Sequence, residues 1–244
     1  MSGAAPAPPP DTATDFPVLL DAGGYQLQPR DAAFIGVSLD SLRAVAGRAY
    51  PLGFPSSEEW QTCLAELRAA LQGDGLLDAD VRLKGTAADF FSRHPDKLFP
   101  RNGGECHAIA AARGSDGPAA EARWNAAPYA MASVLPNRCF WDCRHQLGIS
   151  GELSDYDFQI SSSTLESRIL AMSPSAARQR RALISRDGGQ YRDAVVRRGF
   201  PALDAWSARW QAQLKRNVNI AGFPAAGPTA LISRFDANDW VVVP

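Results

Sequence analysis

Two aspartates separated by one residue, Asp155 and Asp157, are the side chains in this sequence with the clearest chemical potential. They lie in segment 151–163, where aromatic and aliphatic residues alternate with polar ones. This alternation predicts a strand with both carboxylates on one face. Like charges held so close repel each other unless a cation lies between them, and oxygen ligands suit magnesium or manganese. The pair therefore predicts a divalent-metal site for phosphoryl transfer.

The turn Gly85-Thr86 is the second candidate for chemistry. Residues 80–84 alternate apolar and charged side chains and end in Lys84, so a short strand is expected to lead into this turn. Glycine lets a backbone approach a ligand closely, and the Thr86 hydroxyl with the N–H groups of the turn can bind phosphate oxygens. A Gly-Thr turn after a strand is far more often only a turn, so the motif gains meaning only together with the aspartate pair.

A third acid is expected near the C-terminus. Asp239 opens a valine-rich run beside Trp240, which favours it as a further metal ligand. Asp236 is the alternative, although this short segment could also be a simple turn, because Asp and Asn favour turns on their own account. Whether Lys84 and its neighbour Arg82 point toward a bound nucleotide is left open by the alternation.

Cysteine and histidine suggest a different chemistry. Cys106-His107 and the group Cys139, Cys143 and His145 could bind zinc, but neither has the usual Cys-x2-Cys spacing. Buried free cysteines are common, so a structural role is the more probable reading of these residues.

Basic residues are concentrated between residues 176 and 198. Seven arginines in this region could bind a triphosphate or an RNA backbone, although such residues are more often solvated helix faces. They are Arg178, Arg180, Arg181, Arg186, Arg192, Arg197 and Arg198. The tryptophans Trp206 and Trp210 lie on one helical stripe and are expected in the core rather than under a base.

The elements around these motifs predict an α/β (α+β) fold with a small mixed sheet and helices packed on it. Helical periodicity and capping residues indicate helices at 56–71, 163–172, 176–186 and 201–215, and β-like runs close the chain at 229–235 and 239–243. Residues 93–125 contain many glycines and prolines and are expected to be irregular. We expect a disordered segment at 1–15 and one domain at 16–244, with an insertion at about 93–147.

Composition excludes few function classes. The 244 residues carry a net charge of −1 with 45% hydrophobic and 21% charged residues, which gives no global attraction to nucleic acid or membranes. Four cysteines fit a reducing compartment, and the N-terminus lacks the basic start and apolar run of a secretory signal. A cytoplasmic location without membrane contact is therefore expected.

Together, these motifs resemble those of the polymerase β-like nucleotidyltransferase superfamily. The sequence around Gly85 and Asp155 also resembles that of uncharacterised bacterial nucleotidyltransferase-like proteins. The resemblance implies that Gly85 and Thr86 match a Gly-Ser phosphate turn, which with Lys84 would bind the nucleotide. Asp155 and Asp157 would match the metal pair, with Asp239 as the third catalytic and metal-binding acid and Mg2+ or Mn2+ as the cofactor. Two departures are that threonine replaces serine and that Asp155 follows Gly85 by 70 residues, which requires a long insertion.

The function expected from this resemblance is a metal-dependent nucleotidyltransferase that moves a nucleoside monophosphate from an NTP to a hydroxyl acceptor. The acceptor could be a small molecule, a nucleic acid such as RNA, or a protein. The alternative is a catalytically inactive nucleotidyltransferase-like module that binds nucleotide or RNA. A metal-assisted hydrolase is less favoured, because the sequence has no His-rich metal motif.

Overall fold

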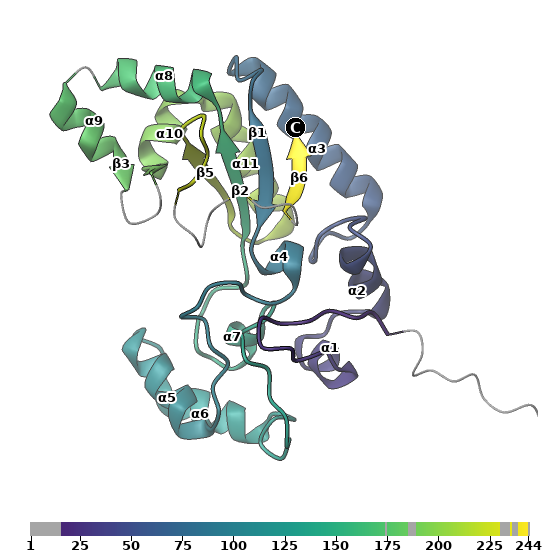
Figure 1. The fold of residues 1–244 in the computed structure, drawn as a ribbon. Helices are drawn as coiled ribbons and strands as arrows, with labels where there is room; N and C mark the ends of the chain where they lie inside the picture. The colour runs from purple at the N-terminus through teal and green to yellow at the C-terminus, as the bar shows by residue number, and fades with distance from the viewer. Residues whose placement is uncertain (1–15, 174, 185–188, 230–234, 236–238, 244) are drawn as a thin grey trace, which may run out of the picture.

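The computed structural model describes residues 16–173, 175–184, 189–229, 235 and 239–243 (Figure 1). The predicted disordered segment 1–15 lies outside these residues, as do Asp236 and most of the predicted run 229–235. In the described part of the chain, no helix combines the length and the apolar character needed to cross a membrane.

A four-stranded mixed sheet forms the centre of the fold, and its strands run in the order β5-β2-β1-β6. Strand β1 is antiparallel to both β2 and β6, whereas β5 runs parallel to β2. The strands are β1 (Asp80–Lys84), β2 (Tyr156–Ser161), β5 (Val218–Phe223) and β6 (Trp240–Val243). The α/β class and the small mixed sheet are thus confirmed.

One face of the sheet is apolar because every second residue of each strand is buried, including Leu83, Phe158 and Trp240. Two long helices pack on this face, α3 (Ser57–Gly73) and α11 (Pro201–Leu214). Trp60 of α3 and Trp206 of α11 both contact Phe158, at ring-centroid distances of 6.3 and 5.0 Å. The predicted core positions of Trp206 and Trp210 are confirmed. The opposite face of the sheet is left with the polar residues of the alternation.

A group of shorter elements follows β2 and lies on the β5 side of the sheet (Figure 1). They are α8 (Ser163–Met172), α9 (Ala176–Ala182), β3 (Leu183–Ile184), β4 (Gln190–Tyr191) and α10 (Asp193–Gly199). Helix α8 is capped by Ser162, whose side chain accepts the N–H of Leu165. The predicted basic helix at 176–186 ends earlier, because β3 begins at Leu183 and pairs with β4.

Segment 93–125 is not irregular, contrary to the expectation from its glycines and prolines. It contains α5 (Gly103–Ala112) and α6 (Gly117–Ala126), capped by Asn102 and Asp116. Glycine and proline lie at the ends of these helices, where they are tolerated, so they mark the boundaries of two short helices. The remaining elements at this end of the molecule are α1 (Pro29–Ile35), α2 (Leu39–Ala46), α4 (Thr86–Asp89) and α7 (Cys143–Gln146).

Residues 93–147, which we call the inserted segment after the expectation above, return to the point where the chain left the sheet. The chain that leaves the sheet and the chain that returns to it run antiparallel, and isolated bridges join Phe91 to Phe140 and Leu98 to Arg138. The N–H of Trp141 donates to the carbonyl of Phe90 at 2.9 Å, beside the end of α4. This pairing closes the 70-residue separation between Gly85 and Asp155 and brings the two motifs together.

Candidate functional site

Four polar side chains form a row across the sheet. Asn219 of β5 lies opposite Asp157 of β2, and Asp157 lies opposite Lys84 of β1. Because Leu83 pairs with Trp240, the antiparallel register places Asp239 beside Lys84 on the other side. Residues opposite each other in a sheet point to the same face, so the row lies on the face opposite α3 and α11.

Gly85 is in contact with the aspartate pair. Its φ of +87° and ψ of −170° lie in a region that is almost exclusive to glycine. A Cβ atom at this position would lie 3.4 Å from Oδ2 of Asp157. The turn therefore needs glycine for its backbone conformation and adjoins one carboxylate of the pair.

The two carboxylates share one hydrogen-bond donor. The side-chain amide of Asn219 donates to Asp155 Oδ2 at 2.9 Å and to Asp157 Oδ1 at 3.1 Å. Burial and the nearby Asp155 raise the pKa of Asp157 to about 6, and the hydrogen bond from Asn219 acts in the opposite direction. Two acids and one amide thus form a site whose electrostatics favour an added positive charge.

The loop before β2 is held by an ion pair that the sequence did not indicate. Arg216 binds Asp142 through two hydrogen bonds of 2.8 and 2.6 Å. Asp142 also accepts the N–H of Ser154, and the Ser154 hydroxyl accepts the N–H of Asp142 at 2.8 Å. Since Ser154 immediately precedes Asp155, these contacts fix where the first carboxylate lies.

A pocket of about 240 Å³ adjoins the pair and is lined by both Thr86 and Asp155. Three cationic side chains of the inserted segment also line it: Lys97, Arg113 and Arg144. The Gly85-Thr86 turn, the aspartate pair and these cations therefore belong to one continuous region of the surface.

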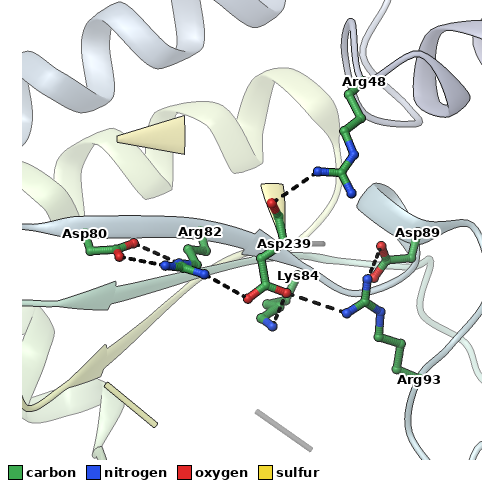
Figure 2. Close-up of polar contacts among 7 residues, drawn as sticks. All are labelled: Arg48, Asp80, Arg82, Lys84, Asp89, Arg93 and Asp239. Atoms are coloured by element: carbon green, nitrogen blue, oxygen red, sulfur yellow. Dashed lines mark hydrogen bonds and ion pairs between the residues drawn. The ribbon is translucent and has the colours of Figure 1, made fainter. Parts of the chain in front are cut away.

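Asp239 forms ion pairs with basic side chains instead of contacting the aspartate pair, as Figure 2 shows. Its side chain is fully buried and forms ion pairs with Lys84, with Arg82 at 3.4 Å and with Arg93 at 3.6 Å. Its backbone carbonyl accepts a hydrogen bond from Arg48 at 3.3 Å. A cation site formed by Asp157 would be about 10 Å away by ordinary strand spacing, with Lys84 between them.

The structure therefore does not bring Asp239 to the aspartate pair, as a third metal ligand would require. Lys84 lies opposite Asp157 in the sheet, but its ammonium group pairs with Asp239 in the same ion-pair network. Of the predicted site residues, Gly85, Thr86, Asp155 and Asp157 come together. Asp236, the alternative third acid, lies outside the described residues.

In the part of the chain that the structure describes, no group of three or more His, Cys, Asp or Glu side chains could hold a metal ion. The ligands that the aspartate pair offers are its carboxylates and, after rotation of the amide, the oxygen of Asn219. Hard oxygen ligands of this kind fit Mg2+ or Mn2+. The same result gives the zinc alternative no support: the thiols of Cys106 and Cys139 instead donate to backbone carbonyls.

The arginines of the C-terminal half lie away from the pair. Arg197 binds Asp193 and Asp204, and Arg192 donates to a backbone carbonyl of the same region. A separate pocket of about 490 Å³ between α8, α9 and α10 is lined by Arg178, Arg181 and Arg198. Arg186 and the side chain of Arg180 lie outside the described part. None of the described members of this group lines the pocket beside Asp155.

Asn219 and the whole of β5 were not predicted from the sequence. The signal was the alternation of Val218 and Ile220 with Asn217 and Asn219, which is a short half-buried strand pattern. The cations of the inserted segment were missed because no local pattern connects Lys97, Arg113 and Arg144 with one another or with the aspartate pair.

Comparisons with known proteins do not place the chain in a family. No protein-family model matches it, and no curated protein or solved structure matches it significantly.

Proposed function

We propose that this protein is a metal-dependent nucleotidyltransferase that transfers a nucleoside monophosphate from an NTP to a hydroxyl acceptor. The observation that carries this proposal is the close approach of the Gly85 turn to Asp157, which follows it by 72 residues in the sequence. The resemblance implies a glycine turn at the end of one strand and two acids on the antiparallel strand beside it. Gly85 follows β1, and Asp155 and Asp157 lie at the start of β2.

The chain's own residues have distinct roles in this proposal. Asp155 and Asp157 would hold a divalent cation, and Asn219 would complete the ligands with its amide oxygen. Such an ion neutralises a triphosphate and activates an attacking hydroxyl. Gly85 allows a phosphate to approach the backbone closely, and the Thr86 hydroxyl can donate to a phosphate oxygen.

The raised pKa of Asp157 is also consistent with a cation site. Burial and Asp155 make its ionised form costly, which is the condition that a bound cation relieves. The hydrogen bonds from Asn219 to both acids partly offset this repulsion in the absence of a cation.

A second candidate is a nucleotide-binding module without catalysis. The observation that favours it is the amide of Asn219 in the place opposite Asp157, where a third carboxylate would complete the site. The ion pairs of Asp239 also leave no further acid in contact with the pair among the described residues. In this case the site would bind a nucleotide and a metal ion but release no pyrophosphate.

One experiment separates the two candidates. ATP, GTP, CTP and UTP, labelled at the α-phosphate, are each incubated with Mg2+ or Mn2+ and with RNA, hydroxylated small molecules or the protein itself as acceptor. Transfer of label with release of pyrophosphate, lost in Asp155→Asn/Asp157→Asn, would establish the enzyme. Metal-dependent binding without transfer would establish the module. If neither the parent protein nor the variant binds any of the four nucleotides, both candidates are wrong.

A further inference from the structure

The inserted segment brings three cations to one side of the candidate site. Lys97 follows α4, Arg113 follows α5, and Arg144 lies in α7. All three line the 240 Å³ pocket beside Thr86 and Asp155, and all three also line a second pocket of about 240 Å³ that adjoins it. Residues from three separate stretches of sequence therefore converge on one place.

Arg144 is the least compensated of these cations. Its Nη2 atom is buried and has no hydrogen-bond partner among the described residues. Burial and the neighbouring Arg113 lower the pKa of Arg144. A buried donor without an acceptor is unfavourable, and so is a second cation close by; an anion in the pocket that both arginines line would relieve the repulsion between their charges.

The thiol of Cys139 lies in the same positive potential. Cys139 lines both pockets, and a hydrogen bond from Cys143 together with the three cations lowers its pKa, against the effect of burial. Lys97 also acts on Asp157, where its charge favours the ionised form. The positive field of the inserted segment thus extends to the aspartate pair.

The acids at the first pocket do not cancel this field. Asp142 is bound by Arg216, Glu152 is exposed, and Asp155 belongs to the proposed cation site. At the second pocket, Glu105 accepts the backbone N–H of Arg101. The other acid there, Asp96, is exposed and lies 3.9 Å from His94.

We propose that Lys97, Arg113 and Arg144 form a polyphosphate-binding subsite, contributed by a part of the chain that none of the recognised motifs includes. This inference rests on the proposed function for the nucleoside, but the subsite itself is defined by the cations alone. Its volume of about 240 Å³ is below the roughly 300–1,000 Å³ of pockets that enclose a whole ligand, so it fits only the phosphate arm. Guanidinium groups suit this role because they bind phosphate oxygens in pairs.

Metal-free binding of inorganic tripolyphosphate tests the subsite. Titration calorimetry in the presence of a chelator compares tripolyphosphate with orthophosphate for the parent protein, Arg144→Gln, Lys97→Gln/Arg113→Gln and the exposed control Arg209→Gln. We expect the parent to prefer tripolyphosphate. Each subsite variant should lose about 10- to 100-fold in affinity, and Arg209→Gln should bind as the parent does. Lys97 and Arg113 are exposed, so their double variant tests the subsite even if Arg144→Gln fails to fold.

The aspartate variant distinguishes this inference from the proposed function. Asp155→Asn/Asp157→Asn should bind metal-free tripolyphosphate at least as tightly as the parent, because it removes negative charge from the edge of the pocket. Arg144-dependent binding of tripolyphosphate without any nucleotide or metal binding would leave the subsite valid and the nucleotidyltransferase proposal wrong. Equal affinity of the parent and both subsite variants, or no binding by the parent, would overturn the subsite.

Discussion

Asn219 lies directly across from Asp157 on the neighbouring parallel strand, and its amide donates to Asp157 Oδ1 at 3.1 Å. The same amide reaches Asp155, so a neutral donor partly satisfies two acids that would otherwise repel each other. Whether the site carries out chemistry or only binds depends on this position, because it is the place where the chain has an amide rather than a third carboxylate.

A carboxylate at this position should make the site depend on metal. We expect Asn219→Asp to lower the free energy of unfolding of the metal-free protein by about 1–3 kcal/mol at pH 8, because three acids then repel one another. Mn2+ should restore the loss, since it binds the folded state. Urea denaturation with and without Mn2+ measures both effects. Asn217→Asp, at an exposed position before β5, is the matched control, and an equal response in both variants would contradict the assignment.

The raised pKa of Asp157 predicts an unusual pH dependence of stability. Between about pH 4 and pH 6 the folded state keeps a proton that the unfolded chain has lost, so the metal-free protein should lose stability as pH rises through this window. Asp157→Asn removes this dependence and should raise the free energy of unfolding at pH 7 by about 1–3 kcal/mol. Urea denaturation from pH 4 to pH 8 measures it. Identical pH profiles for the variant and the parent would show that Asp157 titrates normally.

The affinity for metal should also depend on the ionisation of Asp157, but it should increase with pH, whereas the stability of the metal-free protein decreases. Because a carboxylate must lose its proton to bind a cation, Mn2+ affinity should rise as pH increases toward about 6 and level off above it. Calorimetric titration of Mn2+ at pH 5, 6, 7 and 8 tests this expectation. An affinity that is constant over this range would place the metal site elsewhere.

Gly85 should be sensitive to the smallest possible side chain. Gly85→Ala places a Cβ in a backbone conformation that costs about 1–3 kcal/mol for non-glycine residues and lies 3.4 Å from Asp157 Oδ2. We expect lower stability together with weaker binding of the metal–nucleotide complex. Gly151→Ala is the matched control, because a Cβ there meets nothing within 4 Å. Thermal unfolding and nucleotide titration of both variants test this expectation. If Gly85→Ala is as stable and binds as tightly as Gly151→Ala, the turn does not require glycine and the expectation is wrong.

Asp239 should be a structural residue rather than a metal ligand. Asp239→Asn leaves Lys84 and Arg82 facing a neutral side chain in a buried network, and breaking a buried ion pair typically costs about 3–5 kcal/mol. We expect this loss in urea denaturation with no loss of Mn2+ affinity at a temperature where the variant is folded. The exposed Asp96→Asn should change stability by less than about 0.5 kcal/mol. Loss of Mn2+ binding without loss of stability would restore Asp239 as a ligand.

The parts of this fold that follow local rules could be predicted from the sequence. Alternation gave the strands around Leu83 and Phe158, and capping and apolar spacing gave α3 and α11. Two short helices of the inserted segment were missed, because glycine and proline at helix ends have the same local signature as a loop.

The assignment of the third acid needed information that no local pattern holds. Asp239 and Asn219 each lie at or just before a short strand near the C-terminus, and only the strand order shows which of them lies beside Asp157. The strand containing Asn219 joins β2 and that following Asp239 joins β1, on opposite sides of the aspartate pair. Such pairing depends on contacts between distant segments, as does the convergence of Lys97, Arg113 and Arg144.

The central claim is that Asp155 and Asp157 together bind a divalent cation with a nucleotide. Titration of Mn2+ in the presence of a non-hydrolysable NTP analogue, with the parent protein and Asp155→Asn/Asp157→Asn, tests it most directly. We expect binding by the parent and a loss of at least about 100-fold in affinity in the variant, because both charged ligands are removed while their shape is kept. Equal Mn2+ affinity in the two proteins, or no binding by the parent, would contradict it.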